Sequence, residues 1–174
     1  MEAQAKWWTG GSGATRHAMA SGSRWIRLKV SLVSGRGERF EPAPGRVMIA
    51  GPEHTLAEVA EAIDLGFARW DHSHLHLFRL PDGRELMSGE ESAVADESDG
   101  GSDLSTLESL GLTPGQRFEN VFDIGDDWTH VCEVLAVDAD PEEEYGIVPE
   151  GPVPIEGWGW IPDQYGREAE LQEE

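Results

Sequence analysis

The chain has 174 residues, 39% of them hydrophobic, which is the size and composition of one domain with a modest core. Its apolar runs are far shorter than the roughly 20 residues of a membrane-spanning helix, and residues 1–23 contain no continuous apolar segment. We therefore expect neither a membrane span nor a secretory signal. A single cysteine, Cys132, excludes an intrachain disulfide and favours a reducing, cytoplasmic location.

The net charge of −21 is unevenly distributed along the chain. Residues 1–84 carry 11 Lys and Arg against 9 Asp and Glu, whereas residues 85–174 carry 2 against 25. The second half would repel a phosphate backbone, so nucleic-acid binding is not expected there, and a basic protein partner suits it better.

The predicted organisation is a disordered leader rich in Gly and Ser over residues 1–23, followed by one domain over 24–174. Trp7 and Trp8 are the only bulky apolar pair in the leader, and a docking anchor is the alternative interpretation of this pair.

The first ordered elements have clear periodicities. Arg24–Val33 alternates with Ile26, Leu28, Val30 and Leu32 on one face, which predicts a half-buried strand, and 46–50 predicts an antiparallel partner. Leu56 to Phe67 has the apolar spacing of an amphipathic helix, with Thr55 and Glu58 as a capping box.

A third strand is predicted over Ser73–Leu80, followed by an acidic loop over 88–103. Ser105 and Glu108 repeat the capping-box spacing over a short helical turn.

A hairpin is predicted in the second half. Phe118, Phe122 and Ile124 alternate along one strand, Gly125-Asp126 forms a two-residue turn, and 128–137 returns. After Asp138 the sequence is typical of an acidic loop and then of an aromatic tail, in which Trp158, Trp160 and Tyr165 are expected to fold back onto the domain.

This order of elements predicts an α+β fold with a β-grasp-like, ubiquitin-like layout. It has a mixed sheet and one main helix, extended by the C-terminal hairpin and the aromatic tail. A shared layout bears on the fold and leaves the function open.

These segments resemble one family. Thr55-Leu56, Phe67–Trp70 and His74–Phe78 resemble the first half of the plasmid pRiA ORF-three-like family. Phe122–His130 resembles its central signature, aromatic-Asp-aromatic-Gly-Asp-x-Trp-x-His, with Ile124 replacing the usual aromatic residue. The resemblance covers about residues 24 to 166.

The resemblance implies no particular activity. Many relatives continue with a Cys-Pro-Pro-Glu-Asp type segment, but this chain has Trp158 to Tyr165 instead, so a metal site built on those cysteines does not apply. Some members are labelled as resolvase-like passengers of an insertion element, which implies a mobile-element neighbourhood. The nucleophilic serine supported by several arginines that a resolvase needs is absent from the sequence.

The signature contains the best candidate site: Asp123, Gly125, Asp126, Asp127, Trp128 and His130. Carboxylates and an imidazole within eight residues suit Mg²⁺ or Mn²⁺, with Asp123, Asp126 and His130 as the candidate metal ligands. The competing interpretation is structural: the aspartates accept turn amides, while Trp128 and His130 pack against the tail aromatics.

His72, His74 and His76 form the second candidate, since residues at period two share one strand face and three imidazoles suit Zn²⁺. Their spacing of about 6.6 Å is long for one ion, so hydrogen bonds of His74 and His76 across the sheet are favoured. Cys132 lies in an apolar run without nearby Lys or Arg, which predicts a buried, inert thiol.

Three functions follow, in order. The first is a non-catalytic, cytoplasmic interaction module without a cofactor that binds a protein partner through a sheet edge or the acidic face. The second is a metal-dependent hydrolase or nuclease using Asp123, Asp126, Asp127 and His130. The third is DNA binding through Arg24, Arg27, Lys29 and Arg46. A small homo-oligomer is possible if the aromatic tail swaps between chains.

Overall fold

The computed structural model describes residues 24–88 and 104–166. The predicted leader, with Trp7 and Trp8, lies outside the described residues, as does the predicted acidic loop apart from Ser88. The strands are β1 (Trp25–Gly35), β2 (Glu38–Arg39), β3 (Gly45–Ala50), β4 (His76–Arg79), β5 (Glu85–Ser88), β6 (Arg117–Phe122), β7 (Trp128–Ala139) and β8 (Val153–Trp158). The helices are α2 (Leu56–Gly66), the 3₁₀ helix η2 (Glu108–Leu110) and α3 (Pro141–Tyr145).

One eight-stranded sheet contains all the described strands, in the order β5-β4-β6-β7-β1-β3-β8, with β2 paired to the end of β1. Every pairing between these strands is antiparallel. The α+β class is confirmed, but the mixed sheet is wrong. The long β7 lies antiparallel to β1 at the centre of the sheet, and no crossover aligns two neighbouring strands in parallel.

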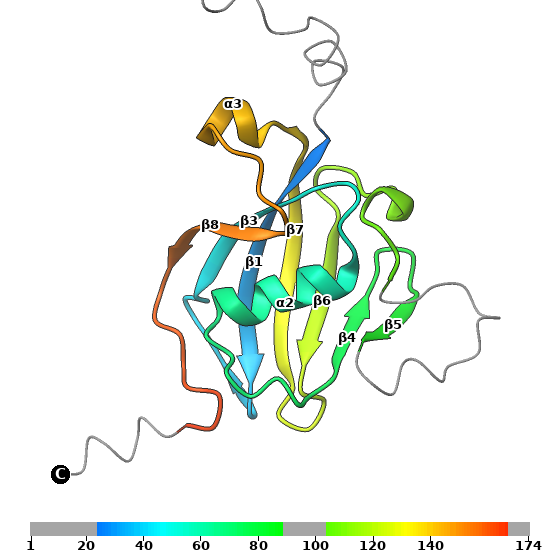
Figure 1. Ribbon diagram of the computed structural model, residues 1–174. Coiled ribbons are helices and arrows are strands. Elements are labelled where there is room, and N and C mark those ends of the chain that lie inside the picture. Colours follow the sequence, from blue (N-terminus) through cyan, green and yellow to red (C-terminus); the bar gives the residue numbers. More distant parts are fainter. Residues whose placement is uncertain (1–23, 89–103, 167–174) are drawn as a thin grey trace, which may run out of the picture.

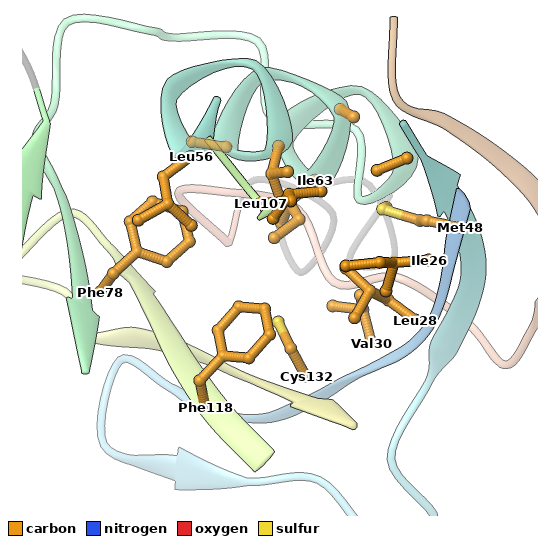
Figure 2. Close-up of a cluster of buried hydrophobic side chains, with 14 of the residues drawn as sticks. Ile26, Leu28, Val30, Met48, Leu56, Ile63, Phe78, Leu107, Phe118 and Cys132 are labelled. Atoms are coloured by element: carbon orange, nitrogen blue, oxygen red, sulfur yellow. The ribbon is translucent and has the colours of Figure 1, made fainter. Parts of the chain in front are cut away.

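Helix α2 crosses one face of the sheet (Figure 1). The alternation of β1 is confirmed, because Ile26, Leu28, Val30 and Leu32 are all buried on the helix side. In Figure 2 these strand residues face Leu56 and Ile63 of the helix. The core therefore lies between α2 and the central strands.

The predicted capping box of α2 is confirmed. The Glu58 amide donates to Thr55 Oγ1 over 3.3 Å, and the Thr55 amide donates to Glu58 Oε2 over 2.7 Å. The second predicted box, between Ser105 and Glu108, does not form, because η2 begins without a side-chain cap. The threonine next in the chain, Thr106, accepts from the Ser109 amide instead.

The chain after Asp138 differs from the expected loop. It forms α3 and then β8, which pairs with β3 along Gly45–Ile49. Trp25, Ile49 and Ala139, with Val153 and Ile155, make a second, smaller apolar cluster. This cluster attaches the acidic C-terminal segment to the sheet.

Candidate functional site

The signature turn joins β6 to β7 and spans five residues, because Phe122 pairs with Trp128. Asp123 and Asp127 both have left-handed backbones, with φ of 58° and 56°, a conformation that Asp tolerates better than most residues. Asp123 Oδ1 accepts from the amides of Gly125 at 3.1 Å and Asp126 at 3.3 Å. The two-residue turn is therefore wrong, and Ile124 lies exposed in the turn.

Trp128 fills the space under this turn, and only 2% of its surface is exposed. Its ring stacks on Phe40 with the centroids 6.2 Å apart, and the Arg69 guanidinium carbon lies 4.2 Å from the ring centroid. Gly35 makes the room, since a Cβ built there would lie 2.1 Å from Trp128 Cε3. The tryptophan is thus a core residue.

His130 is completely buried on the same face of β7 as Trp128 and Cys132. Its Nδ1 lies 3.1 Å from the Asn120 carbonyl oxygen and so donates to it, and its ring meets Phe67 edge-on at 4.8 Å. Burial lowers the pKa of His130 to about 3, which keeps the imidazole neutral. Trp128 and His130 pack on Phe40, Arg69 and Phe67, not on the tail aromatics as predicted.

The structure separates the three predicted metal ligands. Asp123 and Asp126 belong to the turn, whereas His130 is enclosed between the sheet and the helix end. Asp126 takes part through its backbone, accepting from the Arg36 amide. Within residues 24–88 and 104–166, no three His, Cys, Asp or Glu side chains are grouped to hold a metal ion.

The three predicted histidines do not form a row, because β4 begins only at His76. His76 Nε2 lies 2.9 Å from Asp64 Oδ2, and the more exposed His72 lies 3.9 Å from the same oxygen. His74 Nδ1 lies 3.5 Å from Asp123 Oδ2. The predicted hydrogen bond across the sheet holds for His76, whose Nδ1 meets the Asn120 side chain on β6.

These contacts define an inner polar cluster beneath the C-terminal end of α2, made of Asp64, Arg69, His76, Asn120 and His130, all buried. Side-chain bonds link Asp64 to His76 and His76 to Asn120, and the Asn120 backbone continues the chain to His130. Such a connected network fixes side-chain orientation in a core.

Arg69 enters the inner polar cluster because Ala68 takes a left-handed φ of 54° and turns the chain back under the helix. The Arg69 amide donates to the Asp64 carbonyl oxygen over 2.8 Å. Burial lowers the pKa of Arg69 to about 10, against the opposing attraction of Asp64 and Asp163. At neutral pH the cluster therefore contains a buried guanidinium ion.

The C-terminal tail closes over this cluster. Gln164 is fully buried, accepts from the amides of Trp70 and Asp71 at 3.1 and 3.2 Å, and donates to the Asp71 carbonyl oxygen at 3.1 Å. Arg69 Nη2 donates to the Pro162 carbonyl oxygen. Gln164 thus binds the backbone of the segment after α2 as a strand partner would.

Tyr165 folds back as predicted, and its ring meets Trp70 edge-on at 5.2 Å. Its hydroxyl donates to Asp71 Oδ2 over 2.6 Å and also lies 2.8 Å from His74 Nε2. The bond to Asp71 raises the pKa of Tyr165 to about 12, and bonds from Ser73 and Tyr165 lower the pKa of Asp71. Trp158 and Trp160 differ from Tyr165, since 40% and 69% of their surfaces stay exposed.

The model of the family described as "Plasmid pRiA4b ORF-3-like protein" matches residues 25–164. The chain belongs to this family. The match begins in β1 and ends at Gln164, so it contains the signature turn and the whole inner polar cluster.

The fold of this family member recurs in a solved structure, the protein of unknown function MM3350 from Methanosarcina mazei Go1. The two share 17% identity and a TM-score of 0.61 over 87% of this chain and 82% of that one. At this identity the likeness bears on the fold alone. No curated protein matches the chain.

The remaining reactive or cationic candidates are engaged within this family member. Cys132 is buried as predicted, and burial raises the pKa of its thiol. The four basic residues of the predicted DNA surface contact the protein itself: Arg24 pairs with Glu108, Arg27 with Glu144, Lys29 lies over Trp158, and Arg46 binds the Gly66 carbonyl oxygen. None of the described helices is long and apolar enough to span a membrane.

Proposed function

We propose that this family member is a non-catalytic interaction module that binds another protein. One observation carries the proposal: the groups of the signature that are capable of chemistry serve the fold. Asp123 binds turn amides, Trp128 fills the core, and His130 is enclosed and held neutral. A catalytic acid, base or metal ligand must instead reach its substrate.

The finer parts of the proposal follow from composition and family. We place the protein in the cytoplasm, as its single buried thiol suits. We take its origin to be a mobile element, and its helix-crossed sheet to be a β-grasp relative. The acidic second half favours a basic partner.

The test compares binding with turnover in the full-length chain. Asp126→Asn is the informative variant, because the Asp126 backbone supports the turn while the predicted metal chemistry needs its carboxylate. We expect the purified protein to hold no stoichiometric metal by elemental analysis, and both proteins to recover the same partner, verified with purified components.

Turnover of a hydrolase or nuclease substrate that Asp126→Asn abolishes while keeping its circular dichroism spectrum would overturn the proposal. A gel shift of duplex DNA at moderate salt would assign DNA as the ligand instead and would equally contradict it.

A further inference from the structure

Strand β8 forms one border of the sheet. Its neighbour is β3, and no described strand lies on its outer side (Figure 1). Glu156, Gly157 and Trp158 are exposed. An edge strand with free N–H and C=O groups is a template on which another chain can add a strand.

The aromatic end of this edge is held rigidly. The ring of Trp158 lies directly over Gly45, where a Cβ would come within 2.3 Å of the ring. Gly159 has a φ of +81°, and a Cβ there would lie 2.7 Å from the Pro44 Cα atom. The backbone is thus seated against the chain before β3, while Trp158 and Trp160 keep 40% and 69% of their surfaces exposed.

The charge around the edge is negative and lacks local compensation. Between residues 118 and 166 the sequence contains no lysine or arginine, and Glu156 projects from β8 itself. Of the nearby cations, Arg46 donates to the carbonyl oxygens of Gly66, Gly45 and Trp158, and Lys29 lies 5.9 Å from the Trp158 ring centroid.

We infer that β8 binds an extended basic segment of a partner protein as an added strand. Main-chain hydrogen bonds supply the affinity, Glu156 attracts the cationic side chains, and the faces of Trp158 and Trp160 bind lysine or arginine by cation–π contact. Pro154 has no N–H to donate, so the added strand pairs along Ile155–Trp158.

The opposite border, β5, is less suited to this role. It has four residues, and its Glu85 is engaged by Arg79 at 3.1 Å. It therefore provides the matched control: Glu85→Lys reverses the same charge on the other edge of the same sheet. Loss of an exposed ion pair costs at most about 1 kcal/mol, so this variant folds.

The inference rests on the proposed function and is tested with synthetic peptides on the ¹⁵N-labelled full chain. The probe is a six-residue peptide of alternating lysine and valine. We expect it to shift the amide signals of Ile155–Trp158 and the indole signals of Trp158 and Trp160. Glu156→Lys and Trp160→Ala should each weaken binding about fivefold or more, and Glu85→Lys should leave it unchanged.

Two further peptides separate strand addition from plain charge attraction. An alternating glutamate–valine peptide and a lysine–valine peptide with N-methylated backbone should both fail to bind, because the first is repelled and the second cannot pair. Equal binding of the methylated peptide, shifts centred on β5, or no binding of the lysine–valine peptide at millimolar concentration would overturn the inference. If the verified cellular partner still binds Glu156→Lys and Trp160→Ala normally, the β8 assignment fails while the proposed function stands.

Discussion

Replacing Gly35 by alanine tests whether the signature tryptophan is a packing residue. Gly35 ends β1 and is not among the glycines with positive φ, so its backbone accepts a side chain without strain. The added Cβ would lie 2.1 Å from Trp128 Cε3 and 2.6 Å from two further ring atoms, far inside ordinary contact distance. Arg69 on one contact and stacked Phe40 on another limit how far the ring can move.

The expected effect is that of an overpacked core. Inserting a carbon into a filled interior costs about 1–3 kcal/mol, and the closeness of the contact places Gly35→Ala near the upper value. For a chain of this length each kcal/mol lowers Tm by about 2–4 °C, so we expect a fall of about 6–12 °C.

Thermal and urea unfolding followed by circular dichroism measure this directly. In a Trp128→Leu background the same alanine has room, so its penalty should drop below about 1 kcal/mol, giving a clear coupling energy. Gly37→Ala is the control: it meets open space, costs about 1 kcal/mol through its φ of +80°, and gains nothing from Trp128→Leu. A Gly35→Ala protein within 0.5 kcal/mol of wild type, or no coupling to Trp128, would refute the packing role.

Three further predictions test the tail, the thiol and the helix start. Gln164→Ala should lower the free energy of unfolding by about 2–4 kcal/mol in urea titrations, because three buried hydrogen bonds to the Trp70–Asp71 backbone are lost; a loss below 0.5 kcal/mol would argue against tail anchoring. Cys132 should resist Ellman's reagent in the native protein and react fully in guanidinium, and prompt native labelling would contradict its burial. Thr55→Ala should cost about 1 kcal/mol and Ser105→Ala almost nothing, since only the first capping box forms; equal effects would contradict the assignment.

The elements with strong periodicity were predictable from the sequence. The alternation from Ile26 to Leu32 and the spacing from Leu56 to Phe67 both name the buried face correctly. β8 was not predictable in the same way, because its Val-Pro-Ile-Glu-Gly-Trp sequence is typical of a loop. Proline is tolerated there because the strand lies at the sheet edge.

The inner polar cluster depends on contacts between distant segments, yet two of its members left a signal. Asp64 occupies a position of the apolar helix face, four residues after Ala60, and Asn120 lies between the inward-facing Phe118 and Phe122. A polar residue at a core position predicts a buried hydrogen-bonded network. Gln164 left no local signal, because its partners are 93 and 94 residues away.

The signature turn shows where local rules fail. Glycine before aspartate favoured a tight turn led by Gly125, but the left-handed positions are Asp123 and Asp127. The Asp123 carboxylate stabilises the wider turn by accepting two amides, an arrangement that the tight-turn prediction did not include.

The central claim is that the signature is architecture, and an NMR titration of the His130 ring tests it most directly. We expect a neutral imidazole protonated at Nδ1 from pH 8 to about pH 4, unmoved by Mg²⁺ or Zn²⁺, because burial lowers its pKa from 6.5 to about 3. Between those two pKa values the unfolded chain binds the extra proton, so stability falls as the pH falls through this window. Titration of His130 near pH 6.5 in the folded protein, or a metal-induced shift shared with Asp126, would contradict the account.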